Sequence, residues 1–174
     1  MTSAISRPDS SEYAPNYETY VSKVPEGNIV AILEDQRRET QDLLATIPEG
    51  RALHRYAPGK WSIKEVIGHV TDAERVFSYR ALRFARGDQT PLSGFDEKAY
   101  APAGHFDAHD LPDLAAELDA VRRATIALFS GLDSEALARR GPANNKEISV
   151  RALAYVIAGH ERHHVEILRE RYLR

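Results

Sequence analysis

The residues of this chain with the clearest chemical potential lie near its end, in the hexapeptide GHERHH (159–164). Of the chain's seven histidines, His160, His163 and His164 lie in this hexapeptide. On an α-helix, side chains at positions i and i+4 lie about 40° apart, so His160 and His164 share a face. Two imidazoles with this spacing are a common way to chelate a metal ion from one helical turn. The hexapeptide therefore predicts part of a metal site.

The apolar pattern around the hexapeptide does not decide whether His163 or His164 is the second metal ligand of this helix. His160 lies seven residues after Leu153 and seven before Ile167, so it falls within the apolar stripe of a helix. His163 and His164 each follow an apolar residue by seven positions, so both could face inward. The i, i+4 spacing favours the pair His160 and His164, which leaves His163 on the flank.

The same residues match the H-E-x-x-H pattern of zinc peptidases, with Glu161 after the first histidine. In such a peptidase the glutamate is the general base beside the metal, and a third ligand follows downstream. No histidine follows His164, so we disfavour a peptidase. The alternative is that Glu161 lies on the solvent side of a bundle helix.

A third ligand must then come from another part of the chain, and His69 in VIGHVTDAE is the best candidate. It lies at the margin of an apolar helical stripe, where the alternative is a flanking histidine that makes one hydrogen bond. Three neutral imidazoles with an open position suit Zn, Ni or Fe(II). His105 and His109 lie in an irregular stretch, and we expect them to border the site rather than to bind metal. His54 is interpreted as a surface turn residue.

Four amphipathic helices are expected to position these side chains. Ser62 and Glu65 form the pattern of a capping box at the start of the helix that carries His69. Strand signals are absent, which predicts an all-α four-helix bundle. The expected helices are Asn28–Thr46, Ser62 to about Phe84 with Gly87 as the stop, Leu111–Ser130, and Ser149 to the C-terminus, with a short helical piece at Ser134–Arg139.

Two segments outside these helices are expected to be irregular. Residues 1–27 read as an arm that packs Tyr13, Tyr17 and Tyr20 onto the body. The stretch from Asp88 to Asp110 is long and contains prolines and glycines, and such connections are usually functional or poorly ordered. Since it directly follows the helix that carries His69, we expect it to cover or border the metal site.

Composition excludes several classes of protein and site. The chain is 43% hydrophobic and 28% charged with a net charge of −3, which predicts one globular domain over residues 1–174. Its basic residues are scattered, which disfavours a nucleic-acid partner, and no apolar run is long enough to span a membrane. There is no cysteine, so disulfides, thiolate ligands and a cysteine nucleophile are excluded. With no apolar segment near the N-terminus, we expect a cytoplasmic protein.

Three segments of the chain resemble sequences of the DinB-like, YfiT-type superfamily of metal-dependent enzymes. They are YAPGKWSIKEVIGHVTDAERVFSYRALRFARGD (56–88), PLSGFDEKAY (91–100) and AGHERHHVEIL (158–168). The resemblance extends from about Tyr13 to Leu168. It implies a four-helix bundle with down-up-up-down connections that is often a homodimer. It also implies that the metal ligands are His69, His160 and His164.

The resemblance gives less guidance on the reaction. It is compatible with a hydrolase of a small substrate, in which a bound water is activated by a divalent ion, Zn or Ni first and Fe(II) or Mn next. The alternatives are an S-transferase that uses a cellular thiol such as bacillithiol, and a non-catalytic metal-binding protein of a stress response. Neither a nucleic acid nor a membrane is expected as a partner. Four polar residues are candidates for the pocket, each with a surface or bundle-stabilising role as the alternative: Asp72, Arg80, Tyr155 and Asp96.

Overall fold

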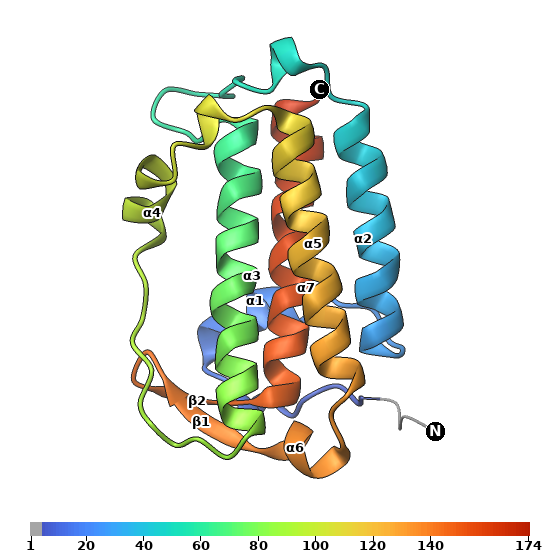
Figure 1. Cartoon of the computed structure of the whole chain (residues 1–174), viewed down its shortest axis with the longest axis vertical. Helices are drawn as coiled ribbons and strands as arrows, with labels where there is room; N and C mark the ends of the chain where they lie inside the picture. The colour runs from blue at the N-terminus through green and yellow to red at the C-terminus, as the bar shows by residue number, and fades with distance from the viewer. Residues whose placement is uncertain (1–4) are drawn as a thin grey trace.

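Four long helices lie side by side in the computed structural model, which describes residues 5–174 (Figure 1). They are α2 (Ile29–Ala45), α3 (Ile63–Ala85), α5 (Leu111–Ser130) and α7 (Val150–Ile167), the last continued by a π-helical turn at Leu168–Tyr172. Both α2 and α3 pack against α5 and α7, so the order around the bundle is α2, α5, α3, α7. The predicted all-α four-helix bundle is confirmed.

The chain direction explains the long connection after α3. In the view of Figure 1, α2 and α7 run upward, whereas α3 and α5 both run downward. The connection from Asp88 to Asp110 must therefore return along the full length of the bundle, and it does so on the outside of α3. This agrees with the connections that the sequence resemblance implies.

Side-chain caps set where three of the long helices begin. The Ser62 hydroxyl accepts a hydrogen bond from the Glu65 backbone N–H, and the Glu65 carboxylate accepts one from the Ser62 N–H, which is the predicted capping box. Asn28 caps α2 and Ser149 caps α7 in the same way, through single side-chain bonds. The sequence prediction of these helices, and of α5, is confirmed.

The prediction that the chain lacks strands is wrong. Strand β1 (Arg140–Ala143) pairs antiparallel with β2 (Lys146–Ser149). The two residues between them, Asn144 and Asn145, have φ angles of 50° and 59°, which a type I′ hairpin turn requires and which asparagine tolerates. Leu92, from the long connection, forms a further bridge to β1. The hairpin closes the lower end of the bundle in Figure 1.

The two segments expected to be irregular also contain helix. The arm includes α1 (Glu18–Val21), which packs against α7, and the long connection includes α4 (Glu97–Ala103). The predicted short helical piece is α6 (Ser134–Ala138). Single 3₁₀ turns complete the described structure, at Ser10–Glu12, Pro15–Tyr17, Glu49–Arg51 and Phe106–Ala108. None of the helices in residues 5–174 is long and apolar enough to cross a membrane.

The core consists of two apolar clusters with a polar layer between them. Along α7, Ile157 belongs to one cluster and Leu168 to the other. The residues between the clusters include seven buried polar side chains, which we call the central polar layer: Gln36, Thr40, His69, Glu74, Arg122, His160 and Glu161. All four long helices contribute to this layer, so each helix interrupts its apolar stripe at about the same height.

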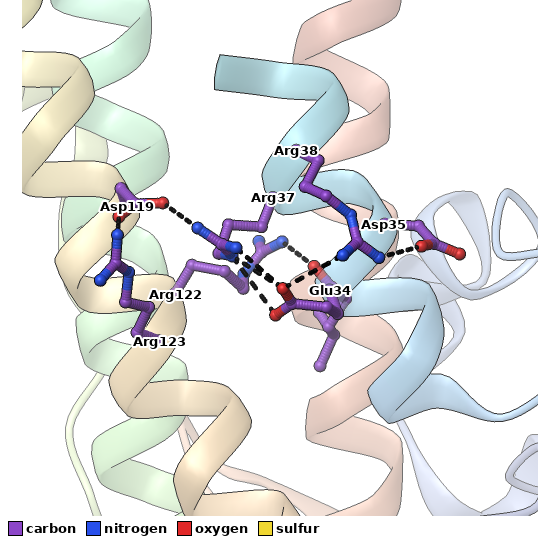
Figure 2. Close-up of polar contacts among 8 residues, drawn as sticks. Glu34, Asp35, Arg37, Arg38, Asp119, Arg122 and Arg123 are labelled. Atoms are coloured by element: carbon purple, nitrogen blue, oxygen red, sulfur yellow. Dashed lines mark hydrogen bonds and ion pairs between the residues drawn. The ribbon is translucent and has the colours of Figure 1, made fainter. Parts of the chain in front are cut away.

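A separate set of ion pairs joins α2 and α5 near the surface (Figure 2). Arg37 of α2 pairs with Glu34 of its own helix at 2.8 Å and with Asp119 of α5 at 2.7 Å. Asp119 also pairs with Arg123 at 2.5 Å. Although burial raises the pKa of Asp119, its hydrogen bonds with Arg37 and Arg123 lower that pKa overall. These partly exposed pairs differ from the central polar layer, whose side chains are buried.

Candidate metal centre

Three histidine side chains converge in the central part of the bundle. His69 comes from α3, while His160 and His164 come from adjacent turns of α7, and one ring nitrogen from each lies within 4.8 Å of the other two. The Nε2 atoms of His69 and His160 are 3.0 Å apart. His69 and His160 are buried and His164 is half-buried. The predicted convergence of these three residues is confirmed as geometry.

Burial keeps these imidazoles in the neutral form. It lowers the pKa of His69 to about 4, and burial together with the neighbouring His69 and His163 lowers the pKa of His164 to about 3. The pKa of His160 lies well below its usual value, chiefly through burial and also through the other histidines. Neutral imidazoles keep a nitrogen lone pair for a metal ion.

The spacing also fits a metal site. Two nitrogens that each lie 2.0–2.1 Å from a tetrahedral ion are about 3.3 Å apart, close to the separation of the two Nε2 atoms of His69 and His160. Among residues 5–174, the one hydrogen bond within the trio joins the Nε2 atoms of His69 and His160, and buried polar groups with few partners are costly. The donor set and its geometry therefore suit a divalent ion that accepts nitrogen ligands.

The other histidines do not join this group. The ring of His163 lies against Tyr20, with ring centroids 5.7 Å apart, and it flanks the cluster as the i, i+4 argument predicted. His105 and His109 are exposed and lie outside the cluster. His54 is exposed, as expected for a surface turn residue.

Each of the two buried histidines follows a glycine that allows another segment to approach closely. A Cβ on Gly159 would lie 1.9 Å from the carbonyl oxygen of Tyr20 in α1, and a Cβ on Gly68 would lie 2.3 Å from the Phe106 ring. The Tyr20 ring also packs edge-on against His160, with centroids 5.2 Å apart. The arm and the long connection therefore cover the histidines from two sides. The repeated Gly-His dipeptide was the sequence signal for this packing, and sequence reasoning missed it.

The long connection borders the site, as predicted. The Glu97 carboxylate of α4 has an oxygen 3.9 Å from Nε2 of His69, although half of its side chain remains exposed. Asp96 fixes the start of α4 by accepting hydrogen bonds from the backbone N–H groups of Lys98 and Ala99. Sequence reasoning did not single out Glu97. Its only signal was a position directly after a helix cap in a connection expected to reach the site.

A cavity of about 530 Å³ opens beside His164. The loop before α3 contributes Tyr56, Lys60 and Trp61 to its lining, and α4 contributes Lys98. The Trp61 ring also contacts His69, with ring centroids 4.8 Å apart. Another cavity, of about 320 Å³, lies between α2 and the start of α5 and contains no histidine. The cavity beside His164 therefore gives a small molecule access to this residue, at the edge of the histidine cluster.

Glu161 is buried, so the expectation that it lies on the solvent side of the helix is wrong. One carboxylate oxygen accepts a hydrogen bond from the Thr40 hydroxyl at 2.7 Å, and the other accepts from Gln36 at 2.9 Å and pairs with Arg122 at 2.8 Å. Arg122 also makes two hydrogen bonds of 2.8 Å to Glu74. We call these five residues the carboxylate–arginine cluster. Because both oxygens of Glu161 are engaged, a general-base role in a peptidase is also excluded.

The four polar residues proposed for the pocket have structural roles instead. None of them is joined to the three histidines by a hydrogen bond or ion pair within residues 5–174. Burial raises the pKa of Asp72, which pairs with Arg75 at 3.7 Å. Their partners are as follows: Arg80 donates to the Ser93 carbonyl, Tyr155 to the Ile5 carbonyl, and Asp96 caps α4.

Comparison with known proteins finds a matching family and a solved structure of similar fold. A family model described as the DinB superfamily matches residues 32–168. The solved structure of YfiT from Bacillus subtilis superposes with a TM-score of 0.72 at 19% sequence identity, covering 81% of this chain and 84% of that one. YfiT is described as "a probable metal-dependent hydrolase with an unusual four-helix bundle topology". Among curated proteins, no sequence matches this chain. At this identity, the likeness to YfiT shows the fold.

Proposed function

Because the chain belongs to the DinB superfamily, we propose that it is a metal-dependent hydrolase of a small substrate, with His69, His160 and His164 as its ligands for a divalent ion. The observation that carries the proposal is the convergence of three neutral imidazoles within 4.8 Å, beside a cavity. Closed structural sites have four protein ligands, whereas three ligands leave a position for water or substrate. The description of YfiT as a probable metal-dependent hydrolase supports the same reaction class.

The ligands and their neighbours have separate tasks in this proposal. A divalent ion held by the three histidines would lower the pKa of a water molecule and polarise a substrate carbonyl. Glu97, whose carboxylate lies 3.9 Å from Nε2 of His69, would take a proton from the attacking water and return it to the leaving group. The water oxygen joins the acyl carbon, the bond to the leaving group breaks, and the leaving group departs with the proton. Tyr20 and Phe106 restrict the approach of other water.

Zinc or nickel is the ion we propose first, because three imidazoles suit both. Fe(II) and Mn remain alternatives. Transfer of a low-molecular-weight thiol would use the same three ligands, so it is a distinct outcome of the test below. The homodimer and the cytoplasmic location stay predictions from the sequence.

The test begins with protein purified without added metal, whose metal content is measured. Zinc-loaded and nickel-loaded samples are then assayed with small esters and amides, and separately with low-molecular-weight thiols plus an electrophile. We expect ester or amide hydrolysis that a chelator abolishes and that added metal restores. Hydrolysis that survives complete metal removal would contradict the proposal, as would fully loaded protein that turns over only the thiol reaction or no substrate at all.

The role of Glu97 is tested separately. Glu97→Gln should keep the bound metal but lower the hydrolysis rate at least about 100-fold, because proton transfer is lost. Glu170→Gln, at an exposed position near the C-terminus, is the matched control and should retain full activity. Equal rates in the two variants would remove Glu97 from the mechanism.

A further inference from the structure

We propose that the cavity beside His164 recognises an anionic group through Lys60 and Lys98, so that the substrate is a small organic molecule with a carboxylate or phosphate. This proposal gives the proposed hydrolase a substrate class, so the word substrate depends on the hydrolase assignment. The binding of an anion to this cavity does not itself require the reaction.

The cavity has the size and position of a substrate site. Its volume of about 530 Å³ lies within the usual range for small-molecule pockets, roughly 300–1,000 Å³. His164 lines the same cavity as the two lysines. A molecule that fills the cavity could therefore place its anionic group near the two lysines and its reacting bond near His164.

The two lysines of the cavity have no carboxylate partner, as is also true of Lys146 in the hairpin among the described residues. Among residues 5–174, neither Lys60 nor Lys98 has a carboxylate within 4.0 Å, whereas Lys23 pairs with Glu166 and Lys64 with Glu49. Lys60 instead holds its ammonium group 5.8 Å from the centre of the Tyr56 ring. In a chain of net charge −3, two unpaired ammonium groups at one cavity form a local positive site.

The nearby carboxylates do not neutralise these ammonium groups. Glu65 and Asp107, at the same end of the bundle, both pair with Arg55, at 3.0 Å and 2.7 Å. The Glu97 carboxylate instead lies beside the histidines, 3.9 Å from Nε2 of His69. The positive charge of Lys60 and Lys98 therefore remains available to a ligand.

Aromatic rings form a wall of the cavity and suit a flat or apolar part of the ligand. Tyr172 donates a hydrogen bond of 2.8 Å to the Trp61 carbonyl, and its ring packs edge-on against Tyr56 with centroids 4.9 Å apart. These contacts hold the wall in place before a ligand arrives. The cavity thus combines a rigid aromatic surface with two cationic groups, the pattern expected for an organic anion.

Trp61 provides a direct assay, because it is the only tryptophan of the chain and lines the cavity. Its fluorescence is titrated with benzoate, phenyl phosphate and the neutral benzyl alcohol, using the full chain both zinc-loaded and after chelator treatment. We expect saturable changes with benzoate or phenyl phosphate in both states, much weaker binding of benzyl alcohol, and weaker anion binding at high salt. The two anions distinguish a carboxylate site from a phosphate site.

Lysine variants assign the binding to this cavity. Lys60→Gln and Lys98→Gln should each weaken anion binding about fivefold, and the double variant should weaken it about 25-fold. Lys146→Gln, at an exposed lysine of the hairpin, is the control and should bind as the wild type does. All these positions are exposed, so the variants should fold normally.

Equal affinity for benzoate and benzyl alcohol would overturn the proposal. So would the absence of any saturable fluorescence change, or anion binding that the double lysine variant retains at wild-type affinity. These results are independent of turnover. If anions bind as expected but metal-loaded protein hydrolyses nothing, the hydrolase proposal fails and the anion site stands. If hydrolysis occurs without anion binding, the anion site fails and the hydrolase proposal stands.

Discussion

Two polar clusters lie next to each other on α7, and they differ in how many hydrogen-bond and ion-pair partners their polar atoms have. His160 and Glu161 are neighbours in the sequence, their side chains point about 100° apart, and both are buried. Glu161 has a partner for each carboxylate oxygen, from Thr40, Gln36 and Arg122. Within the described part of the chain, the hydrogen-bond partner of His160 is a second neutral imidazole, that of His69, 3.0 Å away.

The difference separates structure from function within one layer of the bundle. The carboxylate–arginine cluster joins all four long helices, and Gln36 Oε1 is its one buried oxygen or nitrogen without a partner among the described residues. Glu74 and Glu161 hold the pKa of Arg122 above its usual value, although burial alone would lower it. Among residues 5–174, the histidine cluster has one internal hydrogen bond, between the Nε2 atoms of His69 and His160, and it borders a cavity. A ligand is therefore expected on the histidine side and none on the glutamate side.

The largest expected effect comes from breaking the carboxylate–arginine cluster. Arg122→Met would leave Glu74 and Glu161 buried without their cation, which should lower the free energy of unfolding by about 3–5 kcal/mol. Urea denaturation measures the change. Arg123→Met is the matched control on the next residue of α5: its side chain is 68% exposed, and its loss should cost at most about 1 kcal/mol. Similar costs for the two variants would mean that the cluster does not stabilise the fold.

Acid should destabilise the metal-free protein through the histidine cluster. Below pH 6.5 the unfolded chain binds a proton at His69, whereas folded His69 resists protonation until about pH 4, so stability falls as the pH falls through this window. From pH 7 to pH 5 the expected loss is about 2 kcal/mol from this residue alone. Denaturation at both pH values measures it, in a range where most carboxylates stay ionised. The metal-free His69→Gln variant should show a smaller pH dependence; an unchanged slope would contradict the assignment.

A smaller effect should come from the packing that covers the histidines. Gly159→Ala would place a Cβ 1.9 Å from the Tyr20 carbonyl oxygen, which is backbone and has little freedom to move. We expect α1 to shift away from α7 at a cost of about 1–3 kcal/mol. Gly50→Ala is the control, since a Cβ there meets no atom within 4 Å. Thermal unfolding compares the two, and equal midpoints would show that the close contact is not needed.

Much of the fold could be predicted from local sequence because its signals are local. Apolar spacing and caps such as Ser62 with Glu65 were sufficient for the long helices. The hairpin was missed because Arg, Gly, Pro, Lys and Glu give its strands no alternating apolar pattern, although Asn144 and Asn145 are a turn signal.

The candidate site could be predicted only in part, for a related reason. Spacing on one helix was enough to favour His160 with His164. The burial of Glu161 depends on partners from α2 and α5 that are far away in the sequence, so no local pattern could indicate it. Glu97 lies beside His69, and Lys98 lines the cavity beside His164, only because the long connection follows one particular path along α3.

The most direct test of the account compares bound metal in His164→Ala and His163→Ala. Removing His164 takes away one ligand of the cluster, whereas His163 only flanks it, and each change should alter stability by only about 1 kcal/mol. Metal content and the far-UV helical signal are measured on the same purified samples. We expect a bound ion in the wild type and in His163→Ala, none in His164→Ala, and a folded helical protein in all three. Metal retained without His164 or lost without His163 would contradict the ligand assignment, and loss of helical structure along with the metal would make the ion structural.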